Sequence, residues 1–248
     1  MQQQELSGRV ALVTGAARNI GRAIALAFAE AGAAVVINTR ASRAEAEAVA
    51  HEIEERQGRA LVALADVTDE AAVDRMIEGT LAKFGRLDVL VNNAAVRRER
   101  PIESMDLQEF RSVVALILEG AFITSRAALA ALKRSDGAAI INIGGMTGHS
   151  GAAERAHVVA GKAGLVGLTK ALAHELAPAG ITVNCVVPGL IDTVRTGGIP
   201  MVHRRSPPLV GRLGRTEEIA AMVRHLAGPA GRFVTGQTIH VNGGAYMP

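Results

Sequence analysis

Aromatic residues and cysteine are the scarcest components of this 248-residue chain. Aromatic side chains make up 2% of it, with one tyrosine and no tryptophan, and Cys185 is the single cysteine. One thiol excludes an intramolecular disulfide and any multi-cysteine metal site, and the apolar run around Cys185 predicts a small buried side chain. Aliphatic residues must therefore form the core, which favours a parallel sheet packed between alanine-rich helices.

The net charge is also small, and the apolar runs are short. The chain carries 27 basic and 24 acidic residues, a formal charge of +3. Its arginines are scattered apart from the stretches 97–100 and 203–205, and no aromatic residues are interleaved with them to stack on bases. The N-terminus has no apolar signal-like segment, and no uninterrupted apolar run approaches the thickness of a bilayer. We therefore expect a cytosolic protein with neither nucleic acid nor a membrane as partner.

Strand-like and helical patterns alternate along the chain. Apolar runs typical of strands lie at 9–14, 34–38, 60–65, 87–91, 138–143, 181–187 and 237–241. Helical patterns lie at about 16–31, 42–57, 69–84, 106–135, 156–179 and 216–228. This alternation predicts an α/β fold, a doubly wound parallel sheet of about seven strands in one Rossmann domain over residues 1–248. The Gly-, Pro- and Arg-rich segment 192–214 predicts a flexible loop over the carboxyl ends of the strands, where such sheets bind ligands.

The segment 9–32 contains the pattern strand, tight turn and helix start. Gly15 allows a sharp turn at the end of the strand, and Gly21 allows the helix and strand backbones to pack closely. Asn19 stands where a third glycine would be expected, and asparagine tolerates positive φ best after glycine. The unpaired amides at the start of the helix can hold a pyrophosphate. A glycine turn alone also occurs as a plain joint, so the predicted dinucleotide site depends on the other strand ends.

The end of the second strand bears on which dinucleotide is bound. A carboxylate there would bond the ribose 2′-hydroxyl of NAD, but the chain has Arg40 and no acid until Glu45. An arginine can pair with a 2′-phosphate, and Arg18 in the turn is a second candidate partner. NADP(H) is therefore favoured over NAD(H); the alternative is that both arginines are simply solvated.

Two further strand ends carry residues suited to a cofactor. Asp66 and Val67 close the third strand, where a short carboxylate can accept a hydrogen bond from the adenine amino group. Asn93 and Ala94 close the fourth, where small residues let the backbone lie against the cofactor. Their recurrence at successive strand ends indicates a ligand running along that edge of the sheet.

Ordered motifs along nearly the whole chain resemble those of the short-chain dehydrogenase/reductase family, close to its bacterial 3-oxoacyl-carrier-protein reductase type. The motifs are TGAARNIG, ADVT, NNAA, KAGLVGLTKALAHELAPAGITVN, PGLIDT, GRLGRTEEIA and GQTIHVNGG. The resemblance implies a seven-stranded Rossmann sheet, hydride transfer at the nicotinamide C4, a small-molecule substrate and usually a homotetramer. A homodimer, or a hetero-oligomer with an active homologue, stays open. The implied and inferred cofactor contacts are Gly15, Arg18, Asn19, Ile20, Gly21, Arg40, Asp66, Val67, Asn93, Ala94, Lys162, Pro188, Gly189, Ile191 and Thr193.

The catalytic positions depart from the family. The resemblance implies a tyrosine four residues before Lys162, which protonates the product oxygen, but Val158 stands there and the only tyrosine is Tyr246. The family serine aligns with Gly145, and the asparagine of the long fourth helix aligns with Ile117. Of the four implied catalytic residues only Lys162 is present, and its second implied role is to bind the nicotinamide ribose hydroxyls.

Two histidines are candidate replacements for the proton donor. His157 precedes the tyrosine position but lies about 140° around a helix from Lys162, so its alternative is a surface or interface histidine. His149 lies in a segment after the fifth strand that we expect to be flexible, and its alternative is a solvated loop residue. Glu154 and Arg155 are expected to be solvated. The other histidines show no ligand spacing and no acid cluster is present, so we expect no metal site.

These features predict an oxidoreductase that binds NADP(H) and transfers hydride to or from an unknown small substrate without the usual serine and tyrosine. A conjugated alkene or an imine would suit such a site, with a histidine, water or the substrate handling the proton. The alternative is a catalytically silent cofactor-binding subunit or sensor that pairs with an active homologue.

Overall fold

A computed structural model describes residues 4–194 and 207–248 of the chain. Seven strands form one sheet in the order β3-β2-β1-β4-β5-β6-β7, and every neighbouring pair is parallel. The strands are β1 Val10–Val13, β2 Ala34–Thr39, β3 Arg59–Leu64, β4 Val89–Asn92, β5 Ala139–Ile143, β6 Thr182–Pro188 and β7 Thr238–Val241. The predicted doubly wound α/β sheet is confirmed, with each strand within two residues of its expected bounds.

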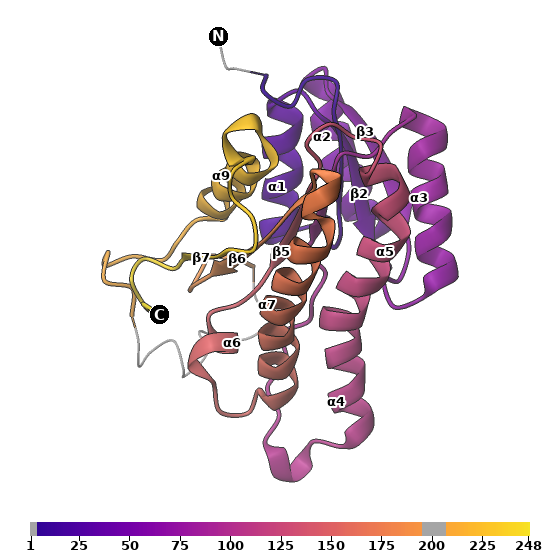
Figure 1. Cartoon of the computed structure of the whole chain (residues 1–248). Helices are drawn as coiled ribbons and strands as arrows, with labels where there is room; N and C mark the ends of the chain where they lie inside the picture. Colours follow the sequence, from indigo (N-terminus) through magenta and orange to yellow (C-terminus); the bar gives the residue numbers. More distant parts are fainter. Residues whose placement is uncertain (1–3, 195–206) are drawn as a thin grey trace.

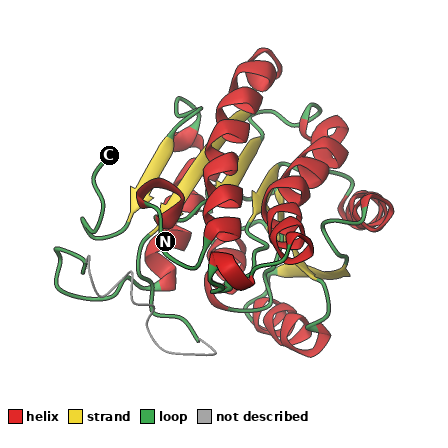
Figure 2. Ribbon diagram, turned by 90° about the horizontal axis from the view of Figure 1, so that it is seen from below, coloured by secondary structure: helices red, strands yellow, loops and turns green. Residues whose placement is uncertain are grey.

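Helices cover both faces of the sheet (Figures 1 and 2). They are α1 Asn19–Glu30, α2 Arg43–Glu55, α3 Glu70–Phe84, α4 Leu107–Val114, α5 Gly120–Leu132, α6 Thr147–Ser150, α7 Ala156–Leu176 and α9 Thr216–Ala227. Alternate residues of the strands face opposite sides, because side chains along a strand repeat every two residues. One core lies under α1, α2 and α9, and the other under α3, α5 and α7.

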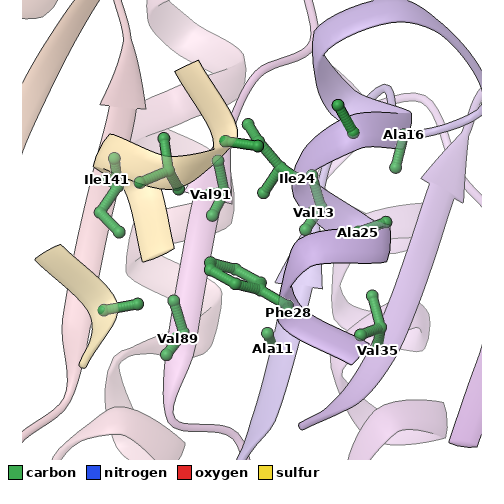
Figure 3. Packing of buried hydrophobic residues seen from close by; sticks show 14 of the residues in the cluster. Ala11, Val13, Ala16, Ile24, Ala25, Phe28, Val35, Val89, Val91 and Ile141 are labelled. Atoms are coloured by element: carbon green, nitrogen blue, oxygen red, sulfur yellow. The ribbon is translucent and has the colours of Figure 1, made fainter. Parts of the chain in front are cut away.

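Aliphatic side chains and one phenylalanine fill the core under α1. Phe28 is fully buried, and Figure 3 shows it and Ile24 pointing from α1 toward Val89 and Val91 of the sheet. Ala11 offers little bulk beneath the helix, which leaves room for the aromatic ring. With few aromatic residues available, the core is filled by small side chains of the strands packed under a few larger side chains of the helix.

The helix predicted at 106–135 is interrupted. A π-helical turn, Ala115–Glu119, joins α4 to α5, and Ile117 lies at its centre. The combined helix Leu107–Leu132 is long and apolar enough to cross a membrane by length and composition alone, but 44% of its most apolar window is buried inside the protein. It packs against α7 and the sheet, as Figure 1 shows, so its apolar composition has a role in the fold.

Two predicted flexible segments have different outcomes. Residues 195–206 of the segment 192–214 lie outside the described residues; at its flanks, Ile191 and Gly214 form a parallel bridge. The segment after β5, by contrast, contains the short helix α6. Gly148 of α6 packs so closely on α7 that a Cβ there would lie 3.0 Å from the Ala163 nitrogen. The expectation of a free loop around His149 is therefore wrong.

Candidate cofactor and active site

The turn after β1 leaves no space for larger residues. Gly15 has φ +61°, and a Cβ on it would lie 3.0 Å from the Ala94 Cα. A Cβ on Gly21 would lie 2.4 Å from the Gly15 carbonyl oxygen. Asn19 has φ +52°, as predicted for the residue in place of a third glycine. Arg18 places no side-chain cap on α1, so the first amides of the helix are available to an anion.

The end of β4 is bonded to this turn. Thr14 Oγ1 accepts hydrogen bonds from the backbone nitrogens of Asn93 (2.9 Å) and Ala94 (3.0 Å). The Asn93 side-chain amide donates to the carbonyls of Thr14 (2.9 Å) and Gly15 (3.0 Å). Asn93 was predicted to line the cofactor, and its side chain supports the turn from the β4 side.

Asn38 braces the turn from the side of β2. It is buried, accepts from the Gly15 backbone nitrogen at 3.4 Å, and donates to the carbonyls of Ala63 (3.2 Å) and Ala65 (3.1 Å). Neither Asn38 nor Thr14 was predicted to have a role at the site. A polar residue at the end of an otherwise apolar strand is the signal that identifies such braces, since a buried amide needs partners.

The predicted adenosine end contains an ion pair. Arg40 Nη1 lies 3.7 Å from Asp66 Oδ2, and the Arg40 side chain is 72% exposed. Asp66 also accepts from the backbone nitrogen (3.0 Å) and hydroxyl (2.8 Å) of Thr68. Burial alone would raise the pKa of Asp66, but the Thr68 hydrogen bonds and the Arg40 charge lower it overall. Asp66 is thus a carboxylate at neutral pH, and Arg40 and Arg18 are both exposed at this edge.

The segment after β6 closes the other side of the edge. A Cβ on Gly189 would lie 2.6 Å from the Asn242 Cα, so this position also requires glycine. The Val194 backbone nitrogen donates to Asn19 Oδ1 at 3.0 Å, which brings the segment containing Ile191 and Thr193 to the start of α1. The predicted cofactor positions therefore lie along one edge of the sheet. Its tight glycines and uncapped helix fit a dinucleotide.

Lys162 lies beside the end of β5. Its Nζ donates to the Ile143 carbonyl at 2.5 Å, and a Cβ on Gly145 would lie 3.5 Å from its Cγ. Burial lowers the pKa of the Lys162 ammonium to about 8; the Cys185 thiol opposes this shift and the Arg97 charge adds to it. Lys162 as a whole residue is half-buried.

Val158 and Ile117, at the positions where the resemblance implied tyrosine and asparagine, are packed together. They are 7% and 2% exposed and share an apolar cluster with Val113, Ala121 and Leu165, against which Val96 also packs. A Cβ on Gly161, one turn after His157, would lie 3.0 Å from the Ile117 Cβ. Neither Val158 nor Ile117 can donate or accept a proton. A small cavity joins Ile117 to the cofactor edge at Thr14, Val67 and Ala94.

Both candidate histidines are less exposed than expected for a surface residue (His157) or a solvated loop residue (His149). His157 is 0% exposed, and neither ring nitrogen has a hydrogen-bond partner among the described residues, so it is not a surface residue. His149 stacks with the rings of His240 and Tyr246 at centroid distances of 4.6 and 5.9 Å. Burial and the Lys170 charge lower the pKa of His149. Neither histidine is a solvated residue.

The expectation for Arg155 is wrong. Arg155, expected to be solvated, is buried and forms an ion pair with Glu99. No group of three or more potential metal-ligating side chains occurs in residues 4–194 and 207–248.

A larger cleft of about 550 Å³ lies between α1, α2 and the start of β3, at the amino ends of the strands and away from the cofactor edge. Ligands of such sheets bind at the opposite ends of the strands.

The fold and the glycine-lined edge define a dinucleotide-binding domain of the Rossmann type. A family model described as "Enoyl-(Acyl carrier protein) reductase" matches residues 15–246. A 3-oxoacyl-[acyl-carrier-protein] reductase of Synechocystis sp. is 41% identical over 98% of both chains. The chain belongs to the short-chain dehydrogenase/reductase family of oxidoreductases.

Solved structures agree with this assignment. A dehydrogenase/reductase from Sinorhizobium meliloti 1021 superposes with a TM-score of 0.94 at 38% identity, over 99% of this chain and 98% of the other. A short-chain dehydrogenase from Burkholderia cenocepacia J2315, solved in complex with NADP, gives a TM-score of 0.92 at 35% identity, over 97% and 99%. The predicted family membership is thus confirmed.

Proposed function

We propose that this protein binds NADP(H) and transfers hydride to or from a small substrate by a mechanism that does not use the family's serine and tyrosine. One observation supports the proposal: close-packed glycines line the predicted cofactor edge, while Gly145, Val158 and Ile117 stand at the positions where the resemblance implies serine, tyrosine and asparagine. The solved relative that binds NADP supports the choice of cofactor.

The cofactor would lie with its pyrophosphate at the start of α1 and its 2′-phosphate near Arg40 and Arg18. NADPH supplies a hydride when bound. Lys162 would hold the nicotinamide ribose hydroxyls, since its ammonium is the remaining polar group beside the β5 end. Ile117 and Val158 would form an apolar wall of this part of the site.

A conjugated alkene or an imine is the substrate class that this site fits best. Reduction of a conjugated double bond needs one hydride at the β-carbon, and the electron pair moves onto the carbonyl oxygen as an enolate. Lys162 stabilises that negative charge, and the α-carbon takes a proton from water. The matched family model bears the description of an enoyl reductase, and an enoyl group is such an alkene. A ketone, by contrast, needs a proton on the oxygen itself.

A silent cofactor-binding subunit or sensor is the second candidate. The packing of Val158 and Ile117 into one apolar cluster favours it, because such packing leaves little space for a reacting group. Either form would assemble as a homodimer or homotetramer, or with an active homologue. The partly buried helix Leu107–Leu132, with Phe122 exposed, would supply a surface for that assembly. A cytosolic location remains part of the proposal.

A substrate screen tests the choice between the two. Purified protein with NADPH is mixed with enones, unsaturated thioesters, imines and ketones, and loss of nicotinamide absorbance is followed. Turnover on an alkene or imine that falls at least 100-fold in Lys162→Ala supports the enzyme. Tight NADPH binding without turnover on any class supports the silent protein. Lys170→Ala, on the same helix, is the matched control and keeps the wild-type rate.

A further inference from the structure

Three aromatic rings meet between α6, β7 and the C-terminal segment. The ring centroids of His149 on α6 and His240 on β7 lie 4.6 Å apart, with the ring planes at 67°. The Tyr246 ring lies 5.9 Å from the first and 5.4 Å from the second. Tyr246 also packs against an apolar cluster that contains Cys185 and Val187 of β6. Packing from several elements therefore holds the two imidazoles in contact.

Each of the two imidazoles has a nitrogen that is buried and unpartnered. His149 Nε2 and His240 Nδ1 are shielded from solvent, and neither has a hydrogen-bond partner among residues 4–194 and 207–248. Thr238 Oγ1, two positions before His240 on the same face of β7, is a third such atom. Buried polar atoms nearly always have partners, so three atoms without one in this region indicate a binding site.

The chemistry of these atoms favours a divalent transition metal. Neutral imidazole is the commonest metal ligand in proteins, and it suits zinc, copper and nickel. Two imidazoles bound to one zinc ion at about 2.0–2.1 Å have ring centroids about 4.5–5 Å apart. The His149 and His240 rings are at this separation. Magnesium and calcium are not expected here, because they prefer oxygen ligands.

We propose that His149 Nε2 and His240 Nδ1 together bind a divalent transition-metal ion such as Zn²⁺, with Thr238 Oγ1 or water completing its coordination. No three His, Cys, Asp or Glu side chains that could hold a metal gather in the described part of the chain, so we expect a two-imidazole site of micromolar affinity. The ion would join α6 to β7. Because Gly148 of α6 packs closely on the Lys162 backbone, the ion would also stiffen the wall beside that lysine. The metal site does not depend on the proposed hydride transfer.

Tyr246 reports directly on this site, since the chain has one tyrosine and no tryptophan. The test titrates Co²⁺, which quenches fluorescence at short range, into protein without an affinity tag. We expect Tyr246 fluorescence to fall until one ion is bound per chain, excess Zn²⁺ to restore it, and Mg²⁺ to leave it unchanged. In proton NMR of the wild-type protein, Zn²⁺ should shift the imidazole resonances of two of the seven histidines.

Substitutions identify the two ligands. His149→Gln and His240→Gln should each weaken Co²⁺ binding about tenfold or more, because one of the two imidazoles is lost. His174→Gln, at an exposed histidine of α7, is the matched control and should bind Co²⁺ as the wild-type protein does. Thermal unfolding shows whether each variant is folded.

Tyr246 fluorescence that is unchanged by millimolar Co²⁺ would overturn the metal site. Quenching that persists in both His149→Gln and His240→Gln would overturn it as well, and so would Zn²⁺ shifts confined to the other histidines. The NMR measurement uses the wild-type protein, so it decides the matter even if a variant fails to fold. None of these results bears on the proposed hydride transfer, which the NADPH assays measure.

Discussion

The ammonium group of Lys162 is buried and has few hydrogen-bond partners to stabilise its positive charge. Its ammonium has one described hydrogen bond, to the Ile143 carbonyl, and burial lowers its pKa to about 8 from an ordinary value of 10.5. A charged group held in this way destabilises the folded state. Proteins retain such costs mainly at functional sites, where activity requires them. Lys162 is therefore the strongest single-residue indication that the site binds a ligand.

Lys162→Met should raise the free energy of unfolding at pH 7 by roughly 1–2 kcal/mol, because a charge of lowered pKa is replaced by an apolar side chain of similar length. The cost of wild-type Lys162 is complete below pH 8, where it is protonated in both states. It declines between pH 8 and 10.5, where only the unfolded state keeps the proton. Urea unfolding at pH 7 and pH 10 measures this. A gain of equal size at both pH values would contradict the assigned cause.

Arg40 is the residue that we expect to favour NADPH over NADH. Removing its side chain in Arg40→Ala should weaken NADPH binding about tenfold and leave NADH binding within about twofold, since only NADPH carries a 2′-phosphate. Fluorescence titration with both nucleotides measures the two constants. Arg43→Ala, on the following helix and paired with Glu47, is the control and should change neither. Equal losses for both nucleotides in Arg40→Ala would refute the 2′-phosphate contact.

Among the elements, the turn from β1 to α1 is the most constrained. Gly21→Ala should abolish dinucleotide binding and lower the free energy of unfolding by roughly 2–4 kcal/mol, because the new Cβ would lie 2.4 Å from a backbone oxygen. Gly79→Ala in the interior of α3 meets no atom within 4 Å and should raise stability by about 0.5–1 kcal/mol. Thermal unfolding of both variants tests the pair. A well-folded, nucleotide-binding Gly21→Ala protein would show that the turn is less tight.

The elements also show which features the sequence can and cannot predict. Apolar runs bounded by turn residues place all seven strands, and the positive φ of Asn19 follows from residue chemistry alone. The π-helical turn at 115–119 escapes prediction, because its side chains follow an ordinary helical pattern and the bulge depends on packing against α7. The folding of α6 onto α7 depends on Gly148 in the same way.

At the scale of the whole molecule, parallel topology brings distant residues to one edge. The alternation of strands and helices is sufficient to predict that the carboxyl ends of β1, β2, β4 and β6 lie on one edge of the sheet, together with most of the predicted cofactor positions. Side-chain partners are less predictable, because they join elements far apart in the sequence. Asn38 bonding the β3 end, Arg155 pairing with Glu99, and His149 stacking on Tyr246 all have this origin.

At the same scale, the predicted cofactor edge and the predicted catalytic positions contribute to the fold in different ways. Backbone geometry and glycines build that edge, with Thr14 and Asn93 as braces, and these features are needed for folding as well as binding. Val158 and Ile117 contribute only side chains to an apolar cluster, so they fill space that polar groups would otherwise occupy. The predicted nucleotide site therefore does not depend on the side chains at positions 158 and 117.

One experiment tests this separation of binding from proton donation most directly: NADPH fluorescence and absorbance are recorded together before and after adding a simple 3-oxoacyl thioester at pH 7. The account predicts that fluorescence changes on binding, which shows that the edge holds the nucleotide, and that the ketone causes no loss of absorbance. Either of two results would contradict the account: NADPH fluorescence that does not change when the protein is mixed with millimolar NADPH, or rapid reduction of the ketone.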